Sequence, residues 1–274
     1  MTDRYAVIGN PVAHSKSPAI HSAFAQSTRQ AMEYTRIEAP RDGFADAVAN
    51  FAAAGGRGLN VTLPFKLEAF ALADATTTRA AAAGACNTLK REAGRWHGDN
   101  TDGAGLMRDL TVNLGVALAG RDVLVLGAGG AARGVLLPLA EARPRMLVIA
   151  NRTTAKAFAL ARNLAPLVQC DAAGVDELAG RDFDVVINAT SAGLANAAPL
   201  PWPATLFRRD ALAYDMVYGD EPTLFLRWAR AAGAARCADG LGMLVEQAAE
   251  SFAWWRGVRP DTAATFERMR PRRG

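Results

Sequence analysis

The sequence predicts an α/β fold made of two domains, and three observations support this prediction. Short apolar segments alternate with longer, alanine-rich amphipathic stretches, which is the βαβ rhythm of a mostly parallel sheet covered by helices. A second series of apolar segments starts after residue 103, once a stretch without this rhythm has ended. At roughly 150 residues per domain, a chain of 274 residues fits two domains.

The first series predicts strands and helices in alternation. Strands are expected at residues 5–9, 32–39 and 58–63, and helices at residues 17–27, 44–54 and 66–74. The segment CNTLKREAGRWHGDN interrupts the rhythm and predicts a β-hairpin that turns at Ala93-Gly94.

The second series begins after a helix expected from Asp102 to about Leu114. Strands follow in RDVLVLGAGG, MLVIANR, FDVVINATS and ALAYDMVY. These segments are apolar at nearly every position, which indicates strands with helices on both faces. A last helix is predicted from about Leu241 to Arg256.

Composition narrows the class of protein. Hydrophobic residues make up 50% and charged residues 21% of the chain, which is typical of a globular protein, and no apolar run approaches the roughly 18 residues of a membrane span. The N-terminus enters a strand without a secretory signal, so we expect a cytoplasmic protein with no membrane partner. The cysteines Cys86, Cys170 and Cys237 lack metal-ligand spacing, which argues against a disulfide framework or a metal site.

The net charge of +4 depends on arginines near the C-terminus. They are Arg256, Arg259, Arg268, Arg270, Arg272 and Arg273. No basic stripe interleaved with aromatic residues accompanies them, so we expect no nucleic-acid partner. We expect the C-terminal segment to be solvated and partly frayed.

A glycine-rich turn predicts a dinucleotide site. Gly127, Gly129 and Gly130 directly follow a predicted strand and precede a predicted helix, and Ala132 takes the third small position of the pattern. Glycines allow a tight turn and a close approach of backbone N–H groups to a pyrophosphate, which then lies at the positive end of the helix.

The end of the next strand favours NADP over NAD. NAD sites usually offer a carboxylate there to the ribose hydroxyls, whereas this chain has Asn151-Arg152-Thr153. Arg152 presents a planar cation suited to a phosphate, and Lys156 lies one helical turn further along.

Polar side chains gather where predicted strands end and helices begin, which is where ligands bind in α/β sheets. They are Asn60, Thr62, Lys66, Asn87 and Asp102. Ser15 and Ser17 flank Lys16 before the first helix, where hydroxyls and free N–H groups favour a carboxylate, although Ser17 also fits an ordinary helix cap. This set suits a polyhydroxylated small acid.

Lys66 stands out because a cation is poorly placed at a helix start, which favours anions. The sequence leaves open whether its amine transfers a proton or stays charged and stabilises an oxyanion. A histidine base has few candidates, since His14 and His21 are expected in a loop and on a helix surface.

The motifs GNPVAHSKSP, NVTLPFK, AGACNTL, GDNTDG, LGAGGAARG and ADGLGMLVEQA are spread over the chain, which resembles the shikimate dehydrogenase family over nearly its full length. The resemblance implies NADPH-dependent reduction of 3-dehydroshikimate to shikimate in aromatic amino-acid biosynthesis. It also implies a Rossmann-type NADP-binding domain at 104–239, and a substrate domain at 1–103 plus 240–274 to which the C-terminal helix returns.

The resemblance also implies residue roles. Lys66 and Asp102 form the catalytic pair, while Ser15 and Ser17 hold the substrate carboxylate. The remaining substrate contacts are Asn60, Thr62, Asn87, Tyr218 and Gln247. The cofactor contacts are Gly127, Ala128, Gly129, Gly130, Ala131, Asn151, Arg152, Thr153, Lys156, Thr190, Met216, Gly240 and Met243.

Two other functions stay open at this point. One is a quinate/shikimate dehydrogenase with relaxed substrate and cofactor choice, and the other is a non-catalytic NADP-binding regulatory module. The oligomeric state is expected to be a monomer or a homodimer.

Overall fold

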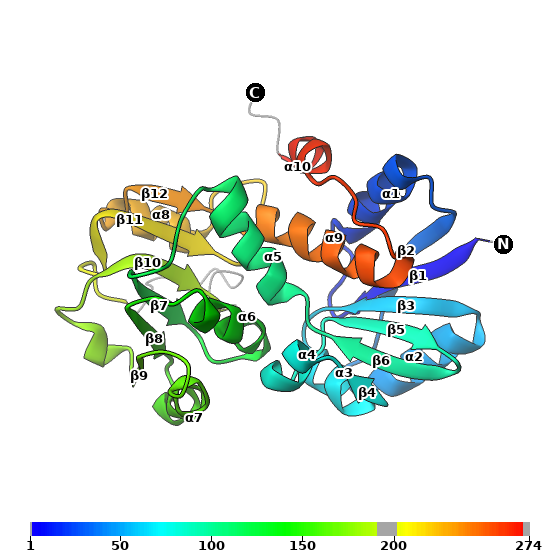
Figure 1. Cartoon of the computed structure of the whole chain (residues 1–274), viewed down its shortest axis with the longest axis horizontal. Coiled ribbons are helices and arrows are strands. Elements are labelled where there is room, and N and C mark those ends of the chain that lie inside the picture. The colour runs from blue at the N-terminus through cyan, green and yellow to red at the C-terminus, as the bar shows by residue number, and fades with distance from the viewer. Residues whose placement is uncertain (1, 191–201, 271–274) are drawn as a thin grey trace. The chain divides into compact units, whose positions relative to one another are not determined.

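The computed structural model describes residues 2–190 and 202–270, which form two compact units. Unit 1 comprises Met1–Gly105 and Leu244–Arg272, and unit 2 is built from Leu106–Met243. The chain therefore passes from one unit to the other within α5 (Asp102–Arg108) and again within α9 (Leu241–Arg256). Figure 1 shows a separate sheet in each unit.

Unit 1 contains a mixed six-stranded sheet in the order β2-β1-β3-β5-β6-β4. Its strands are β1 (Asp3–Gly9), β2 (Met32–Glu38), β3 (Gly56–Val61), β4 (Ala75–Thr76), β5 (Thr88–Glu92) and β6 (Arg95–Asp99). Its other helices are α1 (Ser17–Thr28), α2 (Phe44–Ala53), α3 (Lys66–Leu72), α4 (Thr78–Ala83) and α10 (Ala263–Met269). β1 is parallel to β2 and β3, whereas β5 is antiparallel to both β3 and β6.

The predicted hairpin is confirmed, and it makes this sheet mixed. Ala93 and Gly94 join β5 to β6 with φ values of 49° and 82°, so both residues of the two-residue turn are left-handed. This geometry matches the right-handed twist of the two strands.

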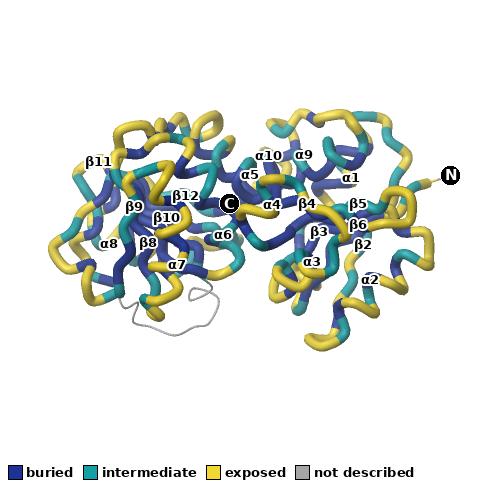
Figure 2. Tube along the Cα trace, turned by 60° about the horizontal axis from the view of Figure 1, so that its bottom comes forward, coloured by how far each residue is buried: buried dark blue, intermediate teal, exposed yellow. Residues whose placement is uncertain are grey.

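The central strands β1 and β3 of the unit 1 sheet are mostly buried, whereas the outer strands are partly exposed, and Figure 2 colours the chain by this burial. Side chains alternate along a strand, so Ala6 and Ile8 of β1 pack in one core cluster while Tyr5 and Val7 pack in another. A further cluster joins α1 to α9, as the resemblance implied for the C-terminal helix.

Unit 2 contains a parallel six-stranded sheet in the order β12-β11-β10-β7-β8-β9. Its strands are β7 (Asp122–Leu126), β8 (Met146–Ala150), β9 (Cys170–Ala173), β10 (Phe183–Asn188), β11 (Phe207–Asp215) and β12 (Arg236–Ala238). Its helices are α6 (Gly130–Glu141), α7 (Thr154–Leu164) and α8 (Leu224–Ala231), with a π-helical segment η1 (Asp109–Asn113) and a 3₁₀ turn η2 (Asp176–Leu178). This is the doubly wound order of dinucleotide-binding folds, and its direction reverses between β7 and β10.

The expectation of a frayed C-terminal segment needs correction. Arg256 forms an ion pair with Asp3, and Arg259 pairs with Glu250 at 2.5 Å, so this segment is not a frayed tail up to Arg270. Acidic partners brought in by the fold hold these arginines. Arg272 and Arg273 lie outside the described residues.

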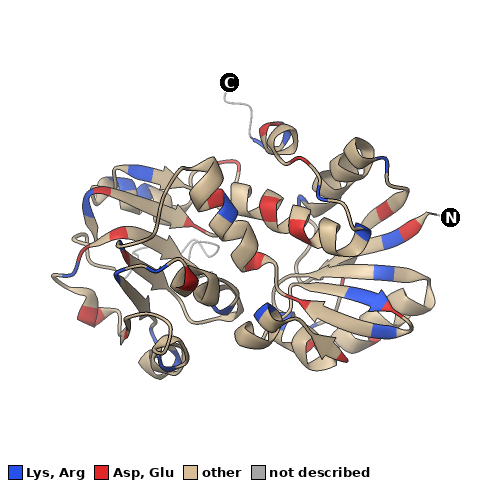
Figure 3. Cartoon of the chain, viewed as in Figure 1, with Lys and Arg blue, Asp and Glu red and all other residues tan. Residues whose placement is uncertain are grey.

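Charges are interspersed on the elements of each unit, as Figure 3 shows. Within the described ranges, no helix combines the length and the apolar character needed to cross a membrane.

Candidate active site and cofactor site

A lysine and an aspartate form an ion pair at one end of the unit 1 sheet. Lys66 is the first residue of α3, and Asp102 is the first residue of α5. The Lys66 Nζ donates to Asp102 Oδ2, and the two side chains are only 15% and 6% exposed. Poor solvation strengthens such an attraction. The chain therefore holds a cationic amine at a site where it can donate a proton or stabilise a negative oxygen.

The second carboxylate oxygen of this pair is held by an amide. Asn87 Nδ2 donates to Asp102 Oδ1 at 2.8 Å, while Asn87 Oδ1 accepts from the Thr101 N–H at 2.8 Å. Gln247 Oε1 of α9 lies 3.2 Å from the same Asn87 nitrogen. Three predicted site residues, Asn87, Asp102 and Gln247, are thus brought together although α9 is far away in the sequence.

A second amide, Asn60, lies in β3 and is buried. Its Oδ1 accepts from the Tyr34 hydroxyl at 2.7 Å. Its Nδ2 donates to Ser251 Oγ at 2.9 Å and to Thr88 Oγ1 at 3.2 Å. Both amide hydrogens of Asn60 are therefore used inside the protein, which leaves its oxygen as the atom able to accept a further hydrogen bond.

The paired serines lie at the start of α1 and are both buried. Ser15 Oγ accepts from the Ser17 N–H at 3.3 Å and donates to Ser17 Oγ at 3.1 Å. The cap position is Lys16, so the alternative of Ser17 as the cap residue is wrong. Thr62, just after β3, is half-buried.

The expectation that His21 lies on a helix surface is wrong. His21 is 0% exposed, and its ring stacks on Tyr34 with centroids 4.2 Å apart. Neither ring nitrogen has a hydrogen-bond partner among the described residues. Burial lowers the pKa of His21 to about 3, and the neighbouring Asn60 offsets only a part of this shift. His14 is exposed, as expected for a loop residue.

The glycine turn of unit 2 joins β7 to α6 at the point where the strand order reverses. Gly127 has a φ of 112°, which strongly favours glycine, and a Cβ there would lie 3.1 Å from Thr190 Cγ2. Gly129 caps α6, and a Cβ on it would meet no protein atom within 4 Å. Ala128 and Ala132 are buried, while Gly130 and Ala131 begin the helix. The turn leaves backbone N–H groups at the start of α6 for a pyrophosphate.

The residues after β8 offer positive charge. Arg152, Thr153 and Lys156 are exposed, and Asn151 Nδ2 donates to Thr153 O at 3.0 Å. No carboxylate occupies positions 151–156, so this segment suits a phosphate better than free ribose hydroxyls.

The remaining predicted cofactor residues lie around the ends of β10 and β11. Thr190 Oγ1 donates to Asn188 Oδ1 at 2.7 Å, and the Met216 N–H donates to Asn188 O at 3.0 Å. A Cβ on Gly240 would come within 2.3 Å of Met216 O. Met243 is buried in the unit 2 core, and Tyr218, which was predicted as a substrate contact, is half-buried after β11.

Asp215 forms hydrogen bonds to the residues around the ends of β10 and β11. It is fully buried and accepts from Thr223 Oγ1 at 2.5 Å, from Asn188 Nδ2 at 3.0 Å and from the Val217 N–H at 3.1 Å. Burial raises the pKa of Asp215 to about 6, although these hydrogen bonds act in the opposite direction. The carboxylate fixes the backbone between Val217 and the end of β11.

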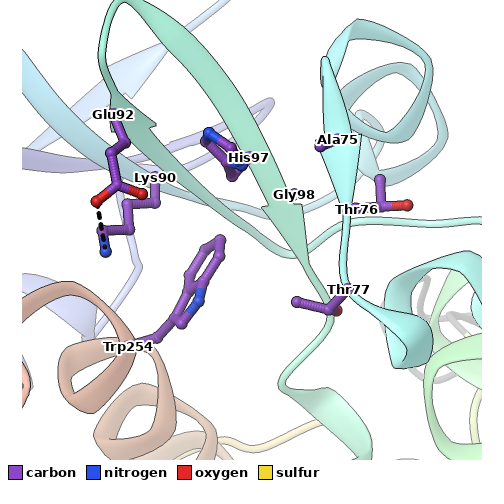
Figure 4. A pocket seen from close by; sticks show the side chains of 8 residues that line it. All are labelled: Ala75, Thr76, Thr77, Lys90, Glu92, His97, Gly98 and Trp254. Atoms are coloured by element: carbon purple, nitrogen blue, oxygen red, sulfur yellow. Dashed lines mark ion pairs between the residues drawn. The ribbon is translucent and has the colours of Figure 1, made fainter.

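A depression elsewhere in unit 1 is separate from these sites. Figure 4 shows it beside β4 and β6, with a volume of about 200 Å³ and with Trp254, His97 and the Lys90–Glu92 ion pair in its lining. None of the predicted substrate-site residues lines it.

Sequence reasoning missed the hydroxyls that connect the amides. Tyr34, Thr88, Thr101 and Ser251 are buried and bond to Asn60, Asn87 or Gln247. Thr88 and Thr101 are next to predicted site residues in the sequence, and Ser251 lies one helical turn after Gln247. Their closeness in sequence to predicted site residues could have indicated that these hydroxyls belong to the site.

The fold and these two sites define a class of protein: two-domain α/β proteins with a doubly wound dinucleotide-binding unit and a second unit that carries a largely buried lysine–aspartate pair. Three family models match the chain. They are the shikimate dehydrogenase substrate binding domain at residues 7–89, the shikimate / quinate 5-dehydrogenase at residues 110–196, and the shikimate 5'-dehydrogenase C-terminal domain at residues 240–270. The chain belongs to the shikimate dehydrogenase family.

Individual relatives agree with this assignment. The shikimate dehydrogenase (NADP(+)) of Alkalilimnicola ehrlichii is 60% identical over 99% of this chain and 100% of its own. The crystal structure of an Ael1 enzyme from Pseudomonas putida is 52% identical, with a TM-score of 0.89 over 98% of both chains. Shikimate 5-dehydrogenase from Thermus thermophilus, in complex with NADP(H) and shikimate, is 36% identical, with a TM-score of 0.85 over 97% of this chain and 98% of its own.

Proposed function

We propose that this protein is an NADP-dependent shikimate dehydrogenase, which reversibly reduces 3-dehydroshikimate to shikimate in aromatic amino-acid biosynthesis. The observation that carries the proposal is the largely buried Lys66–Asp102 ion pair in a chain 60% identical to a shikimate dehydrogenase (NADP(+)). In this proposal unit 1 is the substrate domain and unit 2 is the NADP-binding domain.

The residues of unit 2 fit NADP. The Gly127–Ala131 turn takes the pyrophosphate, since Gly127 has a backbone conformation that strongly favours glycine. Asn151, Arg152, Thr153 and Lys156 take the 2′-phosphate. Thr190, Met216, Gly240 and Met243 line the nicotinamide. Bound NADPH supplies the hydride that reaches C3 of the substrate.

Lys66 handles the proton. In the reducing direction its ammonium donates to the C3 oxygen as negative charge develops there, and in the oxidising direction its amine removes the hydroxyl proton. Asp102 holds the ammonium in place, and Asn87 holds Asp102 through the 2.8 Å bond to Oδ1.

Substrate binding uses the groups around this pair. Ser15 and Ser17 turn their hydroxyls to the carboxylate of the substrate. Asn60 accepts from a ring hydroxyl through Oδ1, because both of its amide hydrogens are already used. Thr62, Asn87, Tyr218 and Gln247 contact the remaining oxygens.

Substitution of Lys66 tests the role of the amine. Lys66→Met should lower kcat by about a thousand-fold or more and change substrate affinity little, since it removes an interaction made in the transition state. Lys66→Arg is the matched control that separates the two roles of the amine. Arg keeps the charge but does not release a proton at ordinary pH. If Lys66→Arg keeps wild-type turnover, charge alone suffices and proton transfer by Lys66 is wrong.

A substrate and cofactor matrix tests the reaction. kcat/KM is measured for shikimate and quinate with NADP⁺ and NAD⁺, and the combination of shikimate with NADP⁺ should exceed the others by tenfold or more. Comparable values with quinate and NAD⁺ indicate a quinate/shikimate dehydrogenase instead. Binding of NADP⁺ without turnover of either acid indicates a non-catalytic module.

We also propose that the enzyme acts in the cytoplasm, as a monomer or a homodimer. Cys86, Cys170 and Cys237 are free thiols, which fits a reducing compartment. The molar mass in solution tests the oligomeric state.

A further inference from the structure

Buried hydrogen bonds join Tyr34 to the catalytic pair across unit 1. They run from Tyr34 through Asn60, Thr88 and Asn87 to Asp102. No member of this chain of bonds is an exposed residue. The residues of this chain of hydrogen bonds belong to segments that are far apart in the sequence and come together only when unit 1 folds.

Each bond in this chain has a definite donor. Tyr34 uses its one hydrogen to donate to Asn60 Oδ1 at 2.7 Å, because an amide oxygen can only accept. This donation directs the Asn60 Nδ2 group toward Thr88 Oγ1 and Ser251 Oγ.

The direction is also fixed at the other end. Thr88 Oγ1 accepts from Asn60 Nδ2 and donates its single hydrogen to Asn87 Oδ1 at 2.8 Å, because the amide oxygen can only accept, while Ser251 Oγ lies further away at 3.0 Å. Asp102 is a carboxylate that only accepts, so Asn87 must present its NH₂ group to Oδ1. Every donor between Tyr34 and Asp102 thus points toward the catalytic pair.

We propose that Tyr34 is a positioning residue for the Lys66–Asp102 pair, acting through Asn60, Thr88 and Asn87. Without the phenol hydroxyl, Asn60 Oδ1 is buried without a donor in the substrate-free protein, which is costly. The amide then regains a partner by turning its oxygen toward Thr88, and Thr88 turns its hydrogen away from Asn87. Asn87 Oδ1 then keeps only the donors of Thr101, and Asn87 holds Asp102 less firmly.

The Tyr34 ring itself is held independently of the hydroxyl. It stacks on His21 and is tilted against Trp255, with centroids 6.3 Å apart. Tyr34→Phe keeps these ring contacts and removes only the hydroxyl. Tyr5→Phe is a matched control, because Tyr5 is also buried and lies 4.8 Å from the Trp255 ring, but its hydroxyl contacts Arg256 outside the chain of bonds.

The first test of this proposal measures kinetics, and it rests on the proposed function. Tyr34→Phe should lower kcat for shikimate oxidation about tenfold, the size expected for one misdirected hydrogen bond to a charged group, and leave KM for NADP⁺ unchanged. Thr88→Val removes the next hydroxyl in the chain while keeping the β-branched shape, and should lower kcat similarly.

The double variant tests whether the two residues act in one chain. Tyr34→Phe combined with Thr88→Val should lose little more activity than the worse single variant, because either change alone interrupts the chain. Tyr5→Phe combined with Thr88→Val should give independent effects. Multiplying losses for the Tyr34 pair would overturn the proposal.

An arm without turnover separates this proposal from the proposed function. In Tyr34→Phe the side-chain amide NMR signals of Asn87 should shift, although Tyr34 does not bond to Asn87 and is linked to it through Asn60 and then Thr88, or Ser251 and Thr101. They should not shift in Tyr5→Phe. Unchanged Asn87 signals overturn the proposal whatever the reaction is. If Tyr34→Phe does not fold, the signals of Asn60 in Thr88→Val decide in the same way.

Discussion

The buried His21 predicts how the stability of unit 1 depends on pH. Its pKa is lowered from 6.5 to about 3 because the folded protein buries the ring among Phe24, Tyr34, Phe252 and Trp255. The unfolded chain binds a proton between these two pKa values and the folded chain does not. Stability from the neutral ring is therefore complete above about pH 6.5 and is lost as the pH falls toward 3.

The size of the effect follows from the two pKa values. At pH 5 the unfolded chain is 1.5 units below its His21 pKa of 6.5, which corresponds to a loss of about 2 kcal/mol relative to pH 8. Asp215 acts in the opposite direction, because its pKa rises from 3.8 to about 6 on folding and its stability contribution is lost as the pH rises through this window. The wild-type profile alone therefore mixes the two groups.

Comparison with a variant isolates His21. Urea unfolding of wild type and His21→Phe is followed at pH 5, 6, 7 and 8 with a probe in unit 1. The difference in unfolding free energy should change by about 2 kcal/mol in favour of the variant between pH 8 and pH 5. The exposed His14→Phe change is the control and should leave the wild-type profile intact. A His21→Phe difference that is the same at all four pH values would refute the buried, neutral imidazole.

Three further substitutions test other parts of the structure. Arg152→Gln should raise KM for NADP⁺ about tenfold and leave KM for NAD⁺ unchanged, because only NADP⁺ carries the 2′-phosphate; equal effects on both would contradict the assignment. Arg79→Met leaves the fully buried Asp99 without its cationic partner and should lower the unfolding free energy by about 3 kcal/mol, whereas Arg145→Gln at the surface should cost much less. Gly240→Ala places a Cβ against Met216 O and should weaken NADP⁺ binding measured by calorimetry; unchanged binding would show that the backbone there adjusts freely.

Local patterns in the sequence determined the elements that depend on near neighbours. The glycine turn after β7, the Ala93-Gly94 hairpin and the helix from Leu241 to Arg256 were all predicted, because each follows from backbone preference or from a periodic apolar pattern. The short edge strands β9 and β12 were not predicted, because Asp171 and Arg236 interrupt their apolar character and pairing with a neighbouring strand defines them.

The candidate site shows the same division. Lys66 and Asp102 were selected from their places at helix starts, and the fold brings them into contact. Polar and charged residues at the ends of predicted strands and helices can be recognised as candidate site residues from the sequence alone.

Only the tertiary structure decided what supports these residues. Ser251 bonds to Asn60 from a position 191 residues away, and no local pattern encodes such a contact. His21 is buried because α1 turns it toward Tyr34 and α9, and Arg259 is held because α9 presents Glu246 and Glu250. Burial and hydrogen-bond partners depend on which elements pack together, and that is fixed by the sum of many weak contacts over the whole unit.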